Sequence, residues 1–199
     1  MSWTRRGQAL GVGFWMLATL GPAGISQAAP ATLVLDPDAT RIHFDVDSTL
    51  HRVEGTARLV AGELRFDTDG GEVSGRVEID ARSLETGNGM RDDALHEDVL
   101  ESERFPRMTF VPERADVVRR EDGEADVRIS GRIDIHGGEH PLVVPARVSV
   151  EGDRVEISAR FPIPYVEWGM EDPGNFLLSV DDVVNVEVET VGRMSPPLP

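Results

Sequence analysis

The sequence predicts an all-β fold made of one antiparallel sheet, with a single short helix inserted between two strands. Apolar and polar residues alternate with period two along most of the chain, as in strands that bury one face. Short glycine-containing turns separate these runs, and no helical crossover of the kind that joins parallel strands intervenes. Only residues 83–110 interrupt the alternation for long, and that interruption is where we expect the helix.

The alternating runs can be followed along the chain. Ile42, Phe44 and Val46 alternate with charged residues, which places one strand face in an apolar interior and the other in water. The same pattern recurs at Val73, Val77 and Ile79, at Val127, Ile129, Ile133 and Ile135, and in the runs 148–150, 155–163 and 184–188. Hairpin turns are predicted at residues 70–71, 122–123, 137–138 and 151–153.

A β-sandwich and a β-barrel both give one apolar face per strand, so the alternation alone leaves both open. The short turns between successive strands favour a barrel. The inward set also contains few aromatic residues, which indicates an interior that side chains do not fill completely. Glycines inside the strand runs can provide bends or bulges that let a sheet curl closed; they are Gly55, Gly62, Gly75 and Gly131.

The inserted helix is predicted at Met90–Leu100, after a Gly-Asn-Gly turn at residues 87–89. Asp92 and Asp93 suit a helix N-terminus, where acidic groups are favourable. Apolar residues recur at helical spacing at Met90, Ala94, Leu95 and Val99. This helix could be a lid or wall of a pocket, through Met90, Leu95 and Val99, or a plug of one barrel end.

The first residues indicate export. Arg5 and Arg6 precede an uncharged stretch at residues 7–25, and Ser26-Gln27-Ala28 fits a small-x-small cleavage site. We therefore expect residues 1–28 to be a cleaved signal peptide, residues 29–199 to form one domain, and the mature protein to be periplasmic. The paired arginines leave the general secretory and twin-arginine routes both open.

A membrane anchor is the alternative for this leader. Gly21, Pro22 and Gly24 cut its apolar core to about a dozen residues, whereas a spanning helix needs about 20. We therefore predict no stable membrane insertion.

Charge and cysteine content exclude several classes of function. The formal charge of −16 becomes about −18 without the leader, which contains two arginines and no acid. Such an acidic surface repels nucleic acid phosphates and anionic headgroups, so no nucleic acid partner is expected. The chain has no cysteine, which removes disulfides, thiolate catalysis and cysteine metal sites.

Several motifs occur together in a fixed order. The helix region reads T-G-N-x-x-R-D-x-x-L from Thr86, followed by Phe105-Pro106 and Thr109-Phe110. Other pieces are Asp36 with Ile42-x-Phe44, Val53-x-Gly55, Ile79-Asp80, Gly131-x-Ile133-x-Ile135, His140-Pro141-Leu142 and Asp182-x-Val184-x-Val186-x-Val188. This order resembles the YceI-like family, over residues 35–192. The resemblance implies a lipocalin-like antiparallel β-barrel of about eight strands that carries a polyisoprenoid lipid in its lumen.

The chain departs from the family pattern at three places. Ala39-Thr40 stands where the family usually has His-Ser, and Asp93-Ala94-Leu95 where it commonly has His after Arg-Asp. No role is carried over to those positions. Residues 165–176, YVEWGMEDPGNF, replace a shorter segment, and we expect this loop near the mouth of the pocket.

The predicted ligand contacts are the inward apolar residues of the barrel, the helix and the loop. They are Phe44, Val46, Val77, Ile79, Met90, Leu95, Val99, Phe105, Phe110, Ile133, Ile135, Trp168, Phe176 and Val186. A lumen lined by them can bury a long hydrocarbon, at about 0.8 kcal/mol per CH₂ removed from water. The alternative is that these side chains pack against one another as an ordinary core.

Polar residues give weaker signals. Asp92 and Asp93 beside Arg91 could be paired carboxylates for acid-base chemistry, but a helix charge set with a structural ion pair is the more common arrangement. His136 and His140, with His96 or Glu139, could suggest a metal; we expect surface histidines instead, since no HExxH-like helical pair exists. Ser83, Ser130 and Ser158 lack a G-x-S-x-G elbow. No catalytic residue, metal or cofactor is therefore predicted.

The sequence thus predicts an exported, soluble, non-enzymatic carrier of a polyisoprenoid or similar long apolar lipid. One alternative is an enzyme acting on such a lipid or on a small amphiphile, using carboxylates of the 86–98 segment. Another is a structural or stress-response module whose pocket stays empty. Acidic residues in the lumen would favour the enzyme, whereas an apolar lumen with polar groups only at its mouth favours the carrier. The oligomeric state, a homodimer included, is left open.

Overall fold

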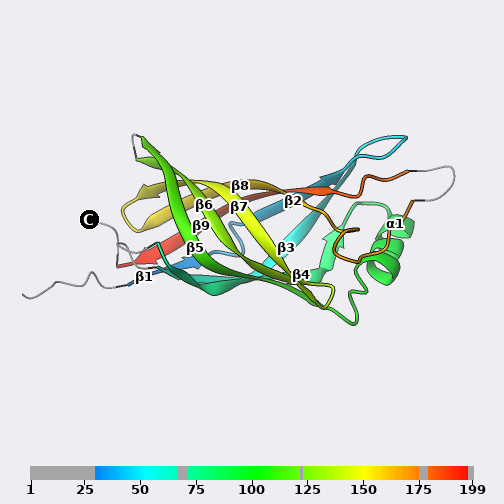
Figure 1. The fold of residues 1–199 in the computed structure, drawn as a ribbon, viewed down its shortest axis with the longest axis horizontal. Coiled ribbons are helices and arrows are strands. Elements are labelled where there is room, and N and C mark those ends of the chain that lie inside the picture. Colours follow the sequence, from blue (N-terminus) through cyan, green and yellow to red (C-terminus); the bar gives the residue numbers. More distant parts are fainter. Residues whose placement is uncertain (1–29, 67–70, 122, 175–178, 197–199) are drawn as a thin grey trace, which may run out of the picture.

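The computed structural model describes residues 30–66, 71–121, 123–174 and 179–196, and within them an elongated barrel of antiparallel strands (Figure 1). The predicted signal peptide lies outside the described residues. The strands are β1 (Ala31–Leu35), β2 (Arg41–Val46), β3 (Val53–Phe66), β4 (Val73–Glu85), β5 (Arg107–Glu121), β6 (Glu124–Ile135), β7 (Gly138–Glu151), β8 (Arg154–Ile163) and β9 (Val184–Ser195).

The nine strands fill eight positions in the ring because β1 and β2 share one of them. Both lie between β3 and β9: β1 pairs with the far end of β3 and the end of β9, and β2 pairs with the start of each. Residues 36–40 separate the two halves. From β2 onward each strand pairs with the next in sequence, and β9 returns to β2. The predicted closed barrel of about eight strands is confirmed.

Two glycines inside strands are needed where neighbouring backbones come close. At Gly75 φ is +115°, and a Cβ atom there would lie 2.1 Å from the Glu63 carbonyl oxygen. Gly131 pairs with Pro112 beside a register shift between β5 and β6, and a Cβ atom would lie 2.3 Å from the Val111 carbonyl oxygen. These positions serve the bending that closure of a small barrel requires.

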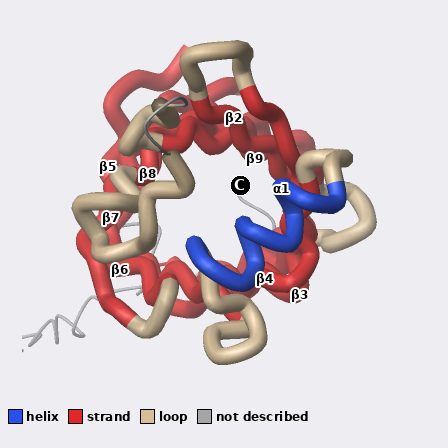
Figure 2. Tube along the Cα trace, turned by 90° about the vertical axis from the view of Figure 1, so that its right-hand side faces the viewer, coloured by secondary structure: helices blue, strands red, loops and turns tan. Residues whose placement is uncertain are grey.

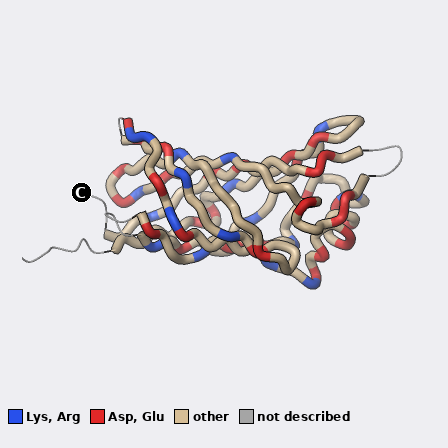
Figure 3. The backbone as a smooth tube through the Cα atoms, viewed as in Figure 1, with Lys and Arg blue, Asp and Glu red and all other residues tan. Residues whose placement is uncertain are grey.

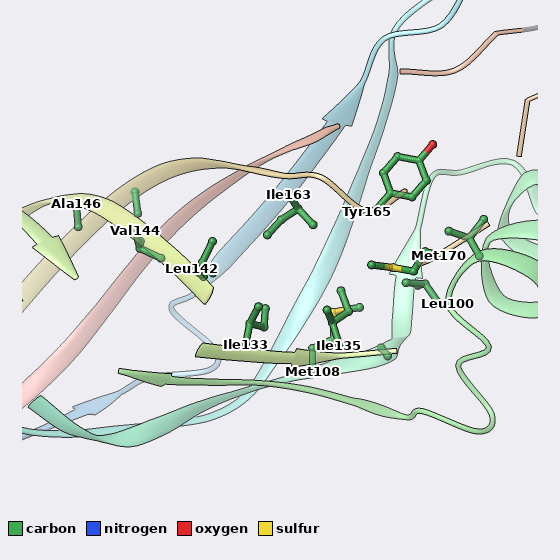
Figure 4. Close-up of a cluster of buried hydrophobic side chains, with 13 residues drawn as sticks. Leu100, Met108, Ile133, Ile135, Leu142, Val144, Ala146, Ile163, Tyr165 and Met170 are labelled. Atoms are coloured by element: carbon green, nitrogen blue, oxygen red, sulfur yellow. The ribbon is translucent and has the colours of Figure 1, made fainter. Parts of the chain in front are cut away.

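The two ends of the barrel differ. The end that holds the start of β1 and the end of β9 is packed by a cluster comprising Ala31, Leu33, Leu35, Ile42, Leu59, Leu64, Val155 and Met194. A second cluster lies towards the opposite end and includes Leu100, Met108, Ile133, Ile135, Leu142, Val144, Ile163, Tyr165 and Met170 (Figure 4). Its side chains surround space rather than meeting in the middle, as the cavity described below shows.

The predicted helix is present at this second end and lies across one side of the ring (Figure 2). It consists of α1 (Gly89–Ala94) and a π-helical turn, η1 (Leu95–Val99). The Asn88 side chain caps α1 by accepting from the Arg91 N–H at 3.2 Å. The wider turn ends with Leu100 N–H donating to the Leu95 carbonyl at 2.9 Å, and Val99 and Leu100 are buried.

Met90 corrects one sequence-based expectation. It lies in the first turn of α1 and is 83% exposed, so it is not part of the inner face of the helix. The apolar spacing assumed a regular helix with one inward stripe. The structure instead buries the end of the helical segment, where the π turn changes the repeat, and leaves its start in solvent.

The outer face of the barrel carries mixed charge (Figure 3). Arg132, for example, contacts Glu113 and Glu139 on the neighbouring strands β5 and β7, at 2.8 and 3.0 Å. Exposed pairs of this kind contribute little to stability, so the interior governs the fold. Among the described residues no helix has the length and apolar character needed to cross a membrane.

Candidate functional site: an apolar cavity inside the barrel

A cavity of about 510 Å³ runs inside the barrel. At its inner limit it reaches Leu35 and Leu64 of the cluster that packs the far end. At the other limit it reaches Leu50 in the β2–β3 loop and Pro173 and Val180 between β8 and β9. The cavity is therefore blind at one end and reaches the loops at the other, which we call the mouth.

The wall of the cavity is made by the inward faces of the strands. Period-two alternation places every second side chain of each strand inward, and these residues are aliphatic with few aromatic rings. Phe44, Phe110 and Phe161 are the aromatic residues that the strands contribute. The helical segment supplies Ala94, Leu95, Val99 and Leu100, so it is part of the cavity wall.

Polar side chains are few among the lining residues, and none is an aspartate or glutamate in the described part of the chain. They are Thr40, Ser48, His51, Thr86, Arg91, Tyr165 and Thr190. The hydroxyls of Thr40 and Thr190 lie 2.6 Å apart and bond to each other. Ser48 donates to the His51 carbonyl at 2.6 Å. The hydroxyls of Thr40, Thr190 and Ser48 are therefore satisfied within the protein.

Thr86 joins the barrel to the helix at the mouth. Its N–H donates to Asp92 Oδ1 at 2.8 Å, and its hydroxyl donates to the same oxygen. Arg91 Nε donates to Thr86 Oγ1 at 2.7 Å and its Nη2 to the Thr86 carbonyl at 3.0 Å. The hydrogen bond from the Thr86 hydroxyl is the main cause that lowers the pKa of Asp92, with a further contribution from the Arg91 charge. Arg91 and Asp92 thus anchor the helix.

Most of the predicted ligand contacts line this cavity. Of the fourteen predicted positions, the lining includes Phe44, Val46, Val77, Ile79, Leu95, Val99, Phe110, Ile133, Ile135 and Val186. Met90 is exposed, as described above, and Phe176 lies outside the described residues. Phe105 and Trp168 are placed elsewhere.

Phe105 and Trp168 pack on the β6–β7 turn rather than in the cavity. The Phe105 ring lies 5.0 Å from the His136 ring, and it covers Gly137 so closely that a Cβ there would be 2.4 Å from the ring. Trp168 stacks on His140 with ring centroids 4.6 Å apart and an interplanar angle of 6°. Both aromatic residues pack their loops against this hairpin, and neither lines the cavity. The prediction that they contact a ligand in the lumen is therefore not retained.

The same contacts correct the expectation of surface histidines. His136 is half-buried under Phe105 and lies 3.2 Å from Glu101 Oε1, and His140 is half-buried under Trp168. Their aromatic partners come from loops distant in sequence, which no local pattern reveals. In the described ranges no group of His, Asp or Glu is arranged to hold a metal ion.

Some lining residues were missed from the sequence. Tyr165 and Met170, 5% and 4% exposed, lie in the 165–176 segment, which we expected near the mouth but in which we chose Trp168 and Phe176 instead. The segment has no period that distinguishes inward from outward side chains. Leu142, Val144, Phe161 and Ile163 lie in regular strands, and their alternation could have identified them.

The fold and the cavity define a lipocalin-like barrel: a ring of antiparallel strands around an apolar space, blind at one end and flanked by a short helix at the other. A family model described as YceI-like domain matches residues 33–192. The chain belongs to the YceI-like family. A comparison with curated proteins gives no match.

Solved structures with the same fold are distant in sequence. Burkholderia cenocepacia BcnA has a TM-score of 0.61 at 18% identity, covering 79% of this chain and 98% of that one. A polyisoprenoid binding domain from Saccharophagus degradans, implicated in plant cell wall breakdown, has a TM-score of 0.60 at 20% identity, and the match covers 81% of this chain and 97% of that one. The YCEI protein of Campylobacter jejuni has a TM-score of 0.56 at 20% identity, and the match covers 66% of this chain and 79% of that one.

The Thr86–Asp92 contact predicts a pH-dependent contribution to stability. Replacing Asp92 with Asn should cost about 1 to 2 kcal/mol at pH 7, because it removes a charge-assisted acceptor. Since the pKa of Asp92 is lowered from its ordinary 3.8 in the folded state, this contribution is complete above pH 3.8 and is lost as the pH falls through the folded value. Thermal melts of both proteins across this range measure it.

The matched control is Asp93→Asn, a neighbouring exposed carboxylate on the same helix. It should leave the melting temperature within a degree or so, about the scatter expected of a surface substitution. A cost equal to that of Asp92→Asn, or a difference for Asp92→Asn that persists unchanged well below pH 3, would contradict the assigned role of Asp92.

Proposed function

We propose that the protein is an exported, non-catalytic carrier that binds a polyisoprenoid or similarly long apolar lipid in the barrel lumen. The observation that carries this proposal is the cavity: about 510 Å³ of apolar space, reached from one end and without a lining carboxylate in the described residues. Ligand sites of about 300 to 1,000 Å³ lined mainly by apolar side chains are typical of proteins that bury small ligands.

Energetics favour a hydrocarbon as the occupant. Each CH₂ group removed from water contributes about 0.8 kcal/mol, and the wall offers such groups a continuous aliphatic surface. A polar or charged small molecule would lose its hydration here without hydrogen-bonding partners in return. The similarity in fold to the polyisoprenoid binding domain of Saccharophagus degradans supports an isoprenoid in particular.

The enzyme alternative has less support from the geometry. The carboxylates of the 86–98 segment do not line the cavity, and the Asp92 carboxylate is engaged by Thr86. Its lowered pKa suits a structural anion rather than a proton donor near neutral pH. We therefore propose that the cavity serves binding alone.

The lipid is proposed to contact the inward residues that were expected from the sequence and that line the cavity. These are Phe44, Val46, Val77, Ile79, Leu95, Val99, Phe110, Ile133, Ile135 and Val186. Tyr165, Met170 and Leu142 are added from the structure.

Ile133 provides the test of the lumen. It is 7% exposed and faces the cavity from β6, so Ile133→Trp should occupy space that the lipid needs. The variant should lose the copurifying lipid, as detected by native mass spectrometry and by mass analysis of an organic extract. Its lipid-free form should melt close to lipid-free wild type, because the ring extends into empty space.

Val143→Trp is the matched control, since Val143 is 49% exposed on the outer face of β7. It should keep stoichiometric lipid. If the interior were closely packed, Ile133→Trp would overpack it and cost about 1 to 3 kcal/mol in the lipid-free protein. That loss, or full retention of lipid by Ile133→Trp, would contradict a lumen open at this position.

Export is the remaining part of the proposal and rests on residues 1–28 of the sequence. In a bacterial host the protein should be recovered from the periplasmic fraction, and N-terminal sequencing should show that roughly the first 28 residues are missing. An intact N-terminus recovered with the membranes would mean that the segment acts as an anchor.

A further inference from the structure

The hydroxyl group of Tyr165 is an unusual feature of the cavity. The residue is 5% exposed and lines the cavity, yet its hydroxyl has no hydrogen-bond partner in the described part of the chain. Most buried polar groups in folded proteins are paired. The other lining hydroxyls described above, those of Thr40, Thr190, Ser48 and Thr86, all have partners within the protein.

The position of this hydroxyl is at the mouth. Tyr165 lies two residues after the end of β8, at the start of the turn formed by residues 165–169. Figure 4 shows its ring beyond Ile163, with the oxygen turned away from Leu142 and Ile133. A long lipid whose chain lies among Ile133, Leu142 and Ile163 would pass the Tyr165 side chain. Because the hydroxyl oxygen itself is buried, the ring must turn for the lipid head to reach it.

The side chains around the hydroxyl include negatively charged carboxylates. Burial raises the pKa of Tyr165 to about 12, and the carboxylates of Asp172, Asp182 and Asp181 add to the shift. The phenol therefore keeps its proton and can donate a hydrogen bond. These three carboxylates would repel an anionic head group, whereas a neutral hydrogen-bond acceptor would not be repelled.

Arg91 is the feature at the mouth that would favour an anion instead. Its guanidinium already donates to the Thr86 hydroxyl and carbonyl, and the Asp92 carboxylate bonds to the same hydroxyl. The Arg91 charge is thus partly offset by Asp92 and held in a structural contact. Tyr165 has no comparable engagement.

We infer that Tyr165 is a specificity-determining residue, whose hydroxyl donates a hydrogen bond to a neutral oxygen, an alcohol or a carbonyl, on the head of the bound lipid. The inference rests on the proposed lipid-carrier function and deepens it. It assigns to this protein amphiphiles with a neutral head in preference to carboxylates or phosphates of the same chain.

The test compares three ligands with one C20 isoprenoid skeleton: geranylgeraniol, geranylgeranyl phosphate and the hydrocarbon phytane. The affinity of each ligand is measured by its displacement of the fluorescent probe N-phenyl-1-naphthylamine from the delipidated full-length protein. The measurement is made on the wild type and on Tyr165→Phe. Wild type should bind the alcohol more tightly than the phosphate. Tyr165→Phe should weaken the alcohol by about threefold to tenfold, the range for one net hydrogen bond, and leave phytane unchanged.

A second variant keeps the test decisive if Tyr165→Phe folds poorly, which a melt of the lipid-free protein reveals. Asp181→Asn combined with Asp182→Asn should raise the affinity for the phosphate and leave the alcohol unchanged, an effect that added salt should reduce. These two positions are exposed at the mouth.

The outcomes separate the two proposals. If all three ligands displace the probe equally well and Tyr165→Phe changes none of them, the carrier function stands and the role of Tyr165 is wrong. A wild type that prefers the phosphate also overturns that role and points to Arg91. If not even phytane displaces the probe from wild type, the carrier proposal fails and the inference about Tyr165 fails with it.

Discussion

Everything else in this structure depends on the closure of one sheet into a ring of eight strand positions. In the closed ring every strand has a hydrogen-bonded neighbour on both sides, although the β4–β5 and β7–β8 ladders cover only part of these strands. The diameter is then set by the number of strands rather than by the volume of the side chains inside. Aliphatic side chains on the inward faces cover the wall of such a ring without filling it, and the cavity follows from that mismatch.

The closure itself depends on local irregularities. Gly75 lets β4 approach β3, and Gly131 lets β6 approach β5 beside a register shift. Residues 36–40 divide one strand position into β1 and β2, and Ala31 and Leu33 of β1 help to pack the closed end. The result is an asymmetric container, in which one end is a packed core and the other is formed by loops and a short helix.

The mouth shows how the chain positions polar groups around an apolar space. Thr86, Arg91 and Asp92 satisfy one another and hold the helix against the barrel. His136 and His140 hold the loops that carry Phe105 and Trp168 through ring contacts. Two buried polar atoms in the described part of the chain have no hydrogen-bond partner, His140 Nε2 and the Tyr165 hydroxyl. Of these two residues only Tyr165 lines the cavity, which is why the ligand contact is proposed there.

The regular parts of this architecture were predictable from the sequence because they depend on a local signal. Period-two alternation identified the inward residues Phe44, Ile133 and Val186, and the helical spacing located α1 and η1. The resemblance to the YceI-like family then decided between barrel and sandwich.

The remaining positions depend on contacts between segments far apart in sequence. Met90 followed the helical spacing but faces solvent, because it lies in the first turn of α1, at the exposed start of the helical segment. Phe105 and Trp168 are apolar and close to the mouth, yet each packs its ring against a histidine of the β6–β7 hairpin. Tyr165 was not selected because an irregular loop carries no periodicity that distinguishes its inward side chains.

The central claim is that the barrel encloses a lumen that an elongated apolar molecule fills. A crystal structure of the protein purified without delipidation tests this most directly. The account predicts continuous elongated density along the cavity, in contact with Leu64 at the blind end and ending near Tyr165 at the mouth. Inward side chains collapsed onto one another, or a chain of ordered waters in the lumen, would contradict it.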